Sequence, residues 1–134
     1  MELQYINGLA VVGAAVCSFV IGSIWYSKIM FGTPWMVLAG LNEQQIKATN
    51  FGKLFGFSFI FQLILASFLS IALSTDAIVT TTGFYTGLIA GLMIFCGIAV
   101  AYLFAQKKWT LIFIDGGYQV LALIVMGVII GFFR

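Results

Sequence analysis

The chain ends in a long apolar stretch, which runs from Trp109 to Phe133 and reads WTLIFIDGGYQVLALIVMGVIIGFF. Asp115 is the only charged residue in it. About 20 apolar residues are enough for an α-helix to cross the hydrocarbon core of a bilayer. A carboxylate carried to the centre of such a helix costs about 2.5 to 3.5 kcal/mol on insertion scales. We therefore expect a membrane-spanning helix in which Asp115 has a polar partner and does not face lipid.

The composition of the whole chain indicates the same class of protein. Hydrophobic residues make up 63% and charged residues 7% of the 134 positions, whereas charged residues make up about a quarter of a typical soluble domain. The net charge of +2 is small and scattered, which argues against nucleic acid as a partner because that requires a clustered basic face.

The residues that most often carry catalysis or bind metals are scarce. Histidine is absent, so the commonest general base and metal ligand are missing. Cys17 and Cys96 lie in different apolar stretches without metal or redox spacing, and we interpret both as packing residues. We expect no catalytic residue, no metal site and no cofactor, and an intramembrane enzyme is the least favoured class.

Three more apolar runs precede the last one, and each is long enough to cross a bilayer. We expect one all-α domain over residues 1–134, an integral membrane bundle of four transmembrane helices. The expected spans are about 6–26, 54–74, 83–104 and 109–133.

The basic residues predict the orientation of these spans. Five of the six lie in the two segments that follow the first and third spans: Lys28, Lys47, Lys53, Lys107 and Lys108, against Arg134 alone on the other side. By the positive-inside rule, these segments face the cytoplasm and both termini face away from it. We expect a bacterial inner membrane protein, with Trp25, Tyr26, Trp35 and Trp109 at the cytoplasmic interface.

The first cytoplasmic segment carries helix signals of its own. Thr33 before Pro34 is typical of an N-cap, and Gly40 is a natural helix end. Asn42 and Gln45 have the spacing of a capping box that opens a second short helix through about Ala48. We expect two short helices lying on the membrane, with Trp35, Met36 and Leu38 dipping into it; an irregular solvated loop is the alternative.

Small residues recur every four positions on three spans. Such stripes allow helix backbones to approach closely in lipid. They can serve packing within one chain or an interface between subunits, and we expect a homo-oligomer in which one of them forms the interface. The stripes are Ala10, Ala14, Ser18 and Gly22; Gly83, Gly87 and Gly91; and Gly127 and Gly131.

The second span carries a polar stripe at the same spacing, formed by Ser58, Gln62, Ala66, Ser70 and Ser74. Gln62 lies near mid-span, so its amide needs partners, for which Ser58, Ser18 and Gln119 are candidates. We favour hydrogen bonding between helices over a surface that lines a solute path. Polar residues gather at the cytoplasmic ends of all four spans, and the candidate ligand-binding or ion-binding residues among them are Asp115, Tyr26, Lys28, Gln62, Tyr118 and Gln119.

Asp115 allows two interpretations. It precedes Gly116 and Gly117, so it could be the N-cap of a membrane helix that begins there, since 18 residues would still cover about 27 Å. Alternatively the helix is continuous from Trp109, and Asp115 points inward toward Lys28, Tyr26 or a polar cavity as a partner or proton carrier. We favour a structural role for Asp115, either as this N-cap or as a partner in an ion pair, over a role as a working carboxylate.

The motif Gly22-x-x-Trp25-Tyr26-Ser27, followed by Phe31-Gly32 and Trp35, is combined with Tyr118-Gln119 and Met126-Gly127 in the last span. In these residues the chain resembles the small bacterial and fungal membrane proteins of domain of unknown function 1761. The resemblance implies four membrane helices, and it implies no particular activity. Lys28 follows Ser27 where many relatives are expected to have Pro, so the resemblance does not define the local turn.

Two functional classes follow from these observations. The first is a transporter-like or channel-like protein with a polar cytoplasmic-side pocket around Asp115 that takes an unspecified small molecule or ion. The alternative is a structural, lipid-binding or accessory membrane subunit without transport activity. Membrane lipids are expected partners in both.

Overall fold

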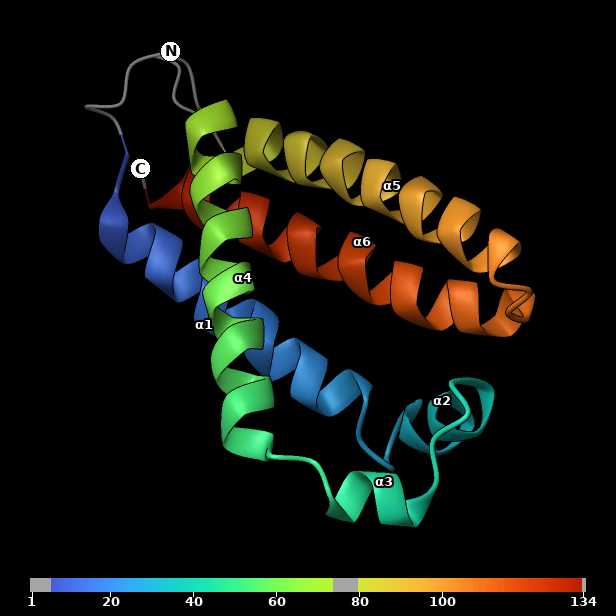
Figure 1. The fold of residues 1–134 in the computed structure, drawn as a ribbon. Helices are drawn as coiled ribbons and strands as arrows, with labels where there is room; N and C mark the ends of the chain where they lie inside the picture. Colours follow the sequence, from blue (N-terminus) through green and yellow to red (C-terminus); the bar gives the residue numbers. More distant parts are fainter. Residues whose placement is uncertain (1–5, 74–79, 134) are drawn as a thin grey trace.

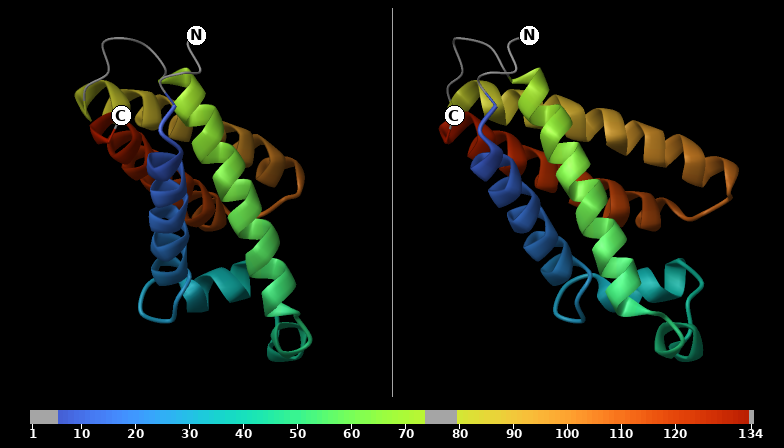
Figure 2. Two further views of the ribbon diagram at one scale, coloured as in Figure 1. Left: turned by 90° about the vertical axis from the view of Figure 1, so that its left-hand side faces the viewer. Right: turned by 60° about the vertical axis from the view of Figure 1, so that its left-hand side comes forward.

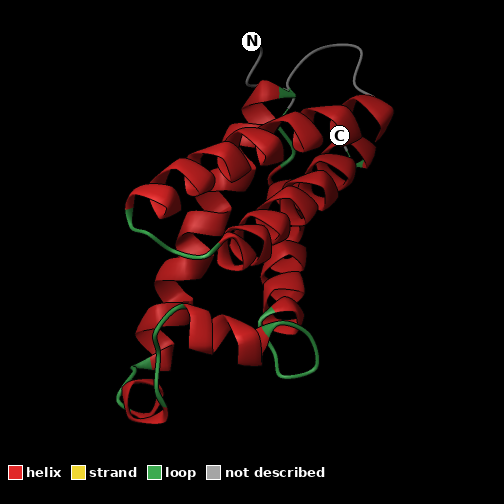
Figure 3. Ribbon diagram, turned by 90° about the vertical axis from the view of Figure 1, so that its right-hand side faces the viewer, coloured by secondary structure: helices red, strands yellow, loops and turns green. Residues whose placement is uncertain are grey.

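The computed structural model describes residues 6–73 and 80–133 (Figure 1). The expected all-α class is confirmed, because these residues contain helices and no strand (Figure 3). In chain order the helices are α1 (Gly8–Trp25), α2 (Gly32–Leu38), α3 (Glu43–Lys47), α4 (Phe51–Ala72), α5 (Thr80–Phe104) and α6 (Trp109–Phe132).

Four of these helices, α1, α4, α5 and α6, are long and apolar enough to cross a membrane. They correspond to the four expected spans, which supports an integral membrane protein. Both α4 and α5 begin earlier than expected, at Phe51 and Thr80. The expected end of the second span at Ser74 lies outside the described residues.

Asparagine side chains begin two of the long helices. The Asn7 side-chain oxygen accepts hydrogen bonds from the backbone N–H groups of Leu9 and Ala10 at the start of α1. The Asn50 oxygen accepts from Lys53 N at the start of α4. These oxygens satisfy backbone donors that have no partner within the helix, so both starting points are encoded locally.

The two short helices lie between α1 and α4, as expected. The capping box is confirmed, because the Asn42 side chain accepts from Gln45 N and the Gln45 side chain accepts from Asn42 N. Gly40 follows α2 with a φ of +75°, a conformation that glycine adopts without strain. The expected N-cap at Thr33 is wrong: α2 begins at Gly32, and Phe31 stands at the cap position without a side-chain hydrogen bond.

The expected orientation of the α2 side chains is also wrong. Trp35, Met36 and Leu38 are half-buried, and Trp35 and Met36 line a cavity that is open on one side. The apolar side chains that this segment exposes are Ile29, Met30 and Val37 instead. The reason is the tight turn before α2, which rotates Trp35 onto the ring of Tyr26 at a centroid distance of 5.3 Å.

The long helices are arranged around α6. Helix α5 runs beside α6 along its length, and α1 packs on another side of α6 (Figures 1 and 2). Helix α4 meets α6 through its second half, where Ala66 and Leu69 are buried with Leu123 and Met126 of α6. In its first half, the rings of Phe55 and Phe59 contact that of Phe19 on α1. The first half of α4 leads away from α6 toward α3 (Figure 2), which leaves space between α1 and α4.

The glycine stripes form the contact between α5 and α6. A Cβ atom added to Gly83 would overlap the Gly127 carbonyl oxygen, and one added to Gly87 would overlap that of Leu123. A Cβ on Gly91 would lie 2.7 Å from Val120 Cα. Close backbone approach of this kind is what small-residue stripes permit. These glycines are therefore used within one chain.

The remaining stripe residues are also used within the chain. Ala14 and Ser18 of α1 are completely buried, and Gly131 of α6 is buried close to Gly83. A Cβ on Gly22 would lie 2.8 Å from the Tyr118 hydroxyl oxygen. A homo-oligomer stays a prediction, and its interface would need a surface other than these stripes.

Candidate functional site

Asp115 lies in the second turn of α6, which is continuous from Trp109. The N-cap position of this helix is occupied by Lys108. The interpretation of Asp115 as an N-cap is therefore wrong. Its side chain points inward and is half-buried, as the continuous-helix interpretation requires.

Both carboxylate oxygens of Asp115 accept hydrogen bonds from phenols. The Tyr26 hydroxyl, just beyond the last residue of α1, donates to Oδ1 at 2.7 Å. The Tyr102 hydroxyl, near the end of α5, donates to Oδ2 at 2.5 Å. Tyr26 was one of the expected partners and is confirmed as such, whereas Lys28 makes no ion pair with Asp115 in the described structure. The carboxylate thus joins α1, α5 and α6 at one end of the molecule.

The surroundings of Tyr26 favour its role as a donor. Its ring lies against those of Trp35 and Tyr118. Burial of the phenol, and then its hydrogen bond to Asp115, raise the pKa of Tyr26 above the ordinary value. The phenol therefore stays protonated and keeps donating to Asp115 even in moderately alkaline solution.

The turn after α1 holds Tyr26 in place. Trp25 Nε1 donates to the Ile114 carbonyl oxygen of α6 at 2.9 Å. The Gly32 N–H donates to the Ser27 carbonyl oxygen at 2.9 Å, which folds α2 back toward α1. A Cβ on Gly32 would lie 2.5 Å from the Tyr26 carbonyl oxygen, so the turn has room only for glycine at this position.

A second polar cluster lies deeper between α1, α4 and α6. Gln62 Nε2 donates to the Tyr118 hydroxyl at 3.1 Å, and Ser18 Oγ donates to Gln62 Oε1 at 2.9 Å. The Tyr118 hydroxyl in turn donates to the Ser18 carbonyl oxygen at 2.9 Å. Of the expected partners of Gln62, Ser18 is confirmed, and Tyr118 replaces the other candidates. The cluster matches the expected hydrogen bonding between helices.

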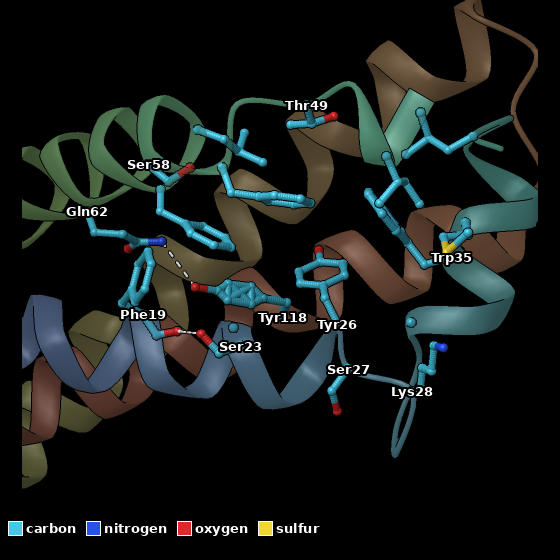
Figure 4. Close-up of a pocket in the computed structure, with 18 residues that line it drawn as sticks. Phe19, Ser23, Tyr26, Ser27, Lys28, Trp35, Thr49, Ser58, Gln62 and Tyr118 are labelled. Carbon is cyan, nitrogen blue, oxygen red and sulfur yellow. Dashed lines mark hydrogen bonds between the residues drawn. The ribbon is translucent and has the colours of Figure 1, made fainter. Parts of the chain in front are cut away.

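A cavity of about 660 Å³ lies beside these two clusters (Figure 4). It occupies the space between α1 and the first half of α4, and α2 and α3 close one end of it. Most of its wall is aromatic or aliphatic, and Lys28 is the only charged residue in the wall. The lining residues are Phe19, Gly22, Ser23, Tyr26, Ser27, Lys28, Gly32, Trp35, Met36, Leu41, Ile46, Thr49, Phe51, Leu54, Phe55, Ser58, Gln62 and Tyr118.

The structure divides the expected site residues into two groups. Tyr26, Lys28, Gln62 and Tyr118 line the cavity. Asp115 does not, although it bonds to Tyr26, which does. Gln119 is also outside the lining, and its Oε1 is buried without a hydrogen-bond partner in the described structure.

Tyr102 is the site residue that sequence reasoning left out of the candidate set, although it lies among the polar residues expected at the cytoplasmic ends of the spans. The available signal was the short connection between the third and fourth spans, which brings residues near their facing ends together. The part of the chain that the structure describes holds no group of three or more His, Cys, Asp or Glu that could bind a metal ion.

The motif residues from Gly22 to Trp35 form the turn after α1, and the motif also supplies one tyrosine to each polar cluster, Tyr26 and Tyr118. A family model described as Protein of unknown function (DUF1761) matches residues 9–131. The chain belongs to this family. The match includes nearly all of the four long helices, so the resemblance seen in the sequence is confirmed over most of the chain. Comparison with curated proteins and with solved structures found no match.

In this DUF1761 protein the main polar groups of the site are hydrogen-bonded to one another beside a mostly apolar cavity. The acidic group is held by two phenols, the amide of Gln62 is held by Ser18 and Tyr118, and the neighbouring cavity is mostly apolar. Such a cavity, with a few placed polar groups, has the character of a small-molecule site.

Proposed function

We propose that this protein binds a small amphipathic molecule from the membrane in the cavity between α1 and α4, without catalysing a reaction on it. The cavity is the observation that supports this proposal most directly. Its volume of about 660 Å³ falls within the range of about 300 to 1,000 Å³ that is usual for ligand sites. The apolar wall suits a hydrocarbon part, and the polar groups near Tyr26 and Lys28 suit a polar end.

The position of the cavity in the fold supports a ligand that comes from the membrane. It lies where the first half of α4 separates from the core, and both flanking helices are long enough to span a bilayer. The short helices α2 and α3 border the same end, where aromatic and basic side chains are concentrated. A membrane-water interface is the usual environment of such side chains.

In this proposal Asp115 stabilises the wall of the cavity through its hydrogen bond to Tyr26. Its two oxygens are occupied by Tyr26 and Tyr102, and it does not line the cavity. A transport role that uses Asp115 as an ion site is less well supported, because each oxygen already accepts a hydrogen bond from a phenol and Asp115 does not line the cavity. This arrangement therefore supports ligand binding better than ion transport.

Tryptophan fluorescence offers a direct test, because Trp35 lines the cavity and Trp109 does not. A variant with Trp25→Phe and Trp109→Phe leaves Trp35 as the only tryptophan, and a variant with Trp25→Phe and Trp35→Phe leaves Trp109. Both lose the Trp25 hydrogen bond to Ile114, so circular dichroism and thermal unfolding first establish that each keeps the native fold. Each is placed in phosphatidylcholine vesicles that contain increasing amounts of a bromine-labelled monoacylglycerol, which quenches tryptophan on contact. We expect quenching of Trp35 to saturate at a low mole fraction and quenching of Trp109, which is 60% exposed, to rise gradually.

A pair of serine variants provides the control. Ser58 lines the cavity from α4, whereas Ser67 lies on the same helix, is exposed and is not in the lining. Ser58→Phe should fill part of the cavity and weaken the saturable quenching of Trp35. Ser67→Phe should leave it unchanged. Identical, unsaturable quenching of both tryptophans would overturn the proposed function.

A further inference from the structure

We infer that the ligand of this cavity is an acyl-chain amphiphile with an anionic headgroup, and that Lys28 recognises the headgroup. This inference rests on the proposed function and narrows it to one chemical class. It depends on three observations: the charge of the cavity wall, the hydrogen bonding of the polar groups deeper in the cavity, and the length of the cavity along α4.

The charge of the wall is entirely positive. Lys28 is the only charged residue among the lining residues, and the lining contains no carboxylate. Lys28 is exposed, and among the described residues it makes no ion pair. An anionic group at this end of the cavity would meet a cation without displacing a protein carboxylate. A cationic group would be repelled by the Lys28 ammonium there.

The two deepest polar side chains that line the cavity, Gln62 and Tyr118, already have partners. Gln62 and Tyr118 are hydrogen-bonded to each other, and both are hydrogen-bonded to Ser18. Because buried polar groups are costly when they lose their partners, these residues have little to gain from a polar group on the ligand. The polar end of an amphiphile is therefore directed to the end of the cavity where Lys28 lies.

The length of the cavity suits an acyl chain. The α4 residues that line it run from Phe51 to Gln62, a rise of about 16 Å along the helix axis. Phe19 of α1 and Leu54 and Phe55 of α4 supply apolar surface along this length. An extended hydrocarbon chain would bury its surface against these residues, whereas a compact polar solute would not.

The orientation expected from the basic residues is consistent with this ligand. It places Lys28 at the cytoplasmic surface, where anionic lipids attract basic residues by about 1 kcal/mol for each lysine or arginine. The shared chemistry, an acyl chain with an anionic head, is present both in a free fatty acid and in an anionic phospholipid. The experiment must therefore separate these two sources.

The experiment uses the Trp35-only protein at pH 9, where a carboxyl group is ionised and lysine is still protonated. In one arm a bromine-labelled fatty acid is compared with the neutral monoacylglycerol of the same chain. In the other arm bromine-labelled phosphatidylglycerol is compared with phosphatidylcholine. We expect the anionic member of at least one pair to reach half-saturation at about fivefold lower mole fraction, and the arm in which this occurs identifies the source.

Variants at Lys28 assign the preference to this residue. Lys28→Gln should remove the fivefold difference, and Lys28→Arg should keep it. Lys107→Gln removes a lysine from the segment between α5 and α6, outside the cavity lining, and should change nothing. The difference should also shrink between 0.1 and 1 M salt, because the Debye length falls from about 10 to about 3 Å.

The outcomes separate this inference from the proposed function. Equal saturable binding of anionic and neutral probes in both arms would overturn the inference and leave amphiphile binding in place. A preference that persists in Lys28→Gln would overturn the role of Lys28. The absence of saturable quenching by any probe would overturn the proposed function and the inference together.

Discussion

Tyr102 and Asp115 face each other across the turn between α5 and α6, and a hydrogen bond of 2.5 Å joins the Tyr102 hydroxyl to Asp115 Oδ2. The other carboxylate oxygen accepts the hydroxyl of Tyr26. One acidic side chain therefore determines where two tyrosines point, and one of them, Tyr26, forms part of the cavity wall. Variants of these residues test whether the carboxylate is structural.

Substitution of Asp115 should destabilise the protein according to how many hydrogen bonds are lost. Asp115→Ala leaves two phenols without an acceptor and should lower the free energy of unfolding by about 1 to 3 kcal/mol. Tyr102→Phe removes one bond and should cost about 0.6 to 1.7 kcal/mol, the range measured between membrane helices. Asp115→Asn keeps the shape and an acceptor, so it should cost least. Unfolding by increasing dodecyl sulfate in mild detergent measures all three, and equal stability of the Asn and Ala variants would contradict a structural role for these bonds.

The contact between α5 and α6 should tolerate no side chain at its glycines. Gly87→Leu should prevent native packing, because even a Cβ at this position would overlap the Leu123 carbonyl oxygen. Gly97→Leu is the matched control on the same helix, since nothing lies within 4 Å of a Cβ there. Size-exclusion chromatography and unfolding in dodecyl sulfate compare the two. Native stability of Gly87→Leu would show that the α5–α6 contact is wrong.

The turn after α1 provides a third prediction. Gly32→Ala should distort the backbone next to Tyr26 and weaken saturable quenching of Trp35, because its Cβ would lie 2.5 Å from the Tyr26 carbonyl oxygen. Gly13→Ala adds the same methyl group to α1, where nothing lies within 4 Å, and should have no such effect. Both variants are compared by thermal unfolding and by Trp35 quenching. If they behave alike, the turn does not need glycine.

The orientation in the membrane is predicted from the lysines and can be measured by labelling. In a background with Cys17→Ala and Cys96→Ala, single cysteines are placed at Asn42 and at Thr80. These positions lie at the start of the α3 region and at the start of α5. An impermeant maleimide should label them from opposite sides of the membrane, with Asn42 on the cytoplasmic side. Labelling of both from one side would contradict the number of spans between them.

Local signals made much of the fold predictable. The four spans follow from hydropathy alone, and the capping box at Asn42 and Gln45 follows from residues three positions apart. The partnership of Ser18 with Gln62 was also accessible, because a mid-span amide restricts the choice to polar residues at similar depth. In each case the interaction either joins residues that are close in the sequence or follows from the need to pair polar groups within the membrane.

The rest depended on how helices are rotated about their axes, which hydropathy does not specify. Four apolar spans have little amphipathic character. The glycine stripe of α5 indicated which of its faces packs closely, but it did not indicate that Tyr102 points at Asp115. Thr33 was the wrong cap because backbone hydrogen bonds between Ser27 and Gly32 decide where α2 begins. A pocket at this end was predicted, and Tyr26, Lys28, Gln62 and Tyr118 line it. Its place between α1 and α4 was not predictable, since it arises where α4 departs from α6.

The glycine face of α5 has a consequence for the gene. Glycine is the only amino acid without a Cβ, so every missense change in the codons for Gly83, Gly87 and Gly91 adds an atom where the backbone of α6 already lies. No conservative replacement is available at these three positions. Neighbouring codons such as those for Ile89 and Met93 encode exposed side chains and can drift among apolar residues. A saturation scan of this helix should therefore show intolerant positions recurring every four codons within an otherwise permissive segment.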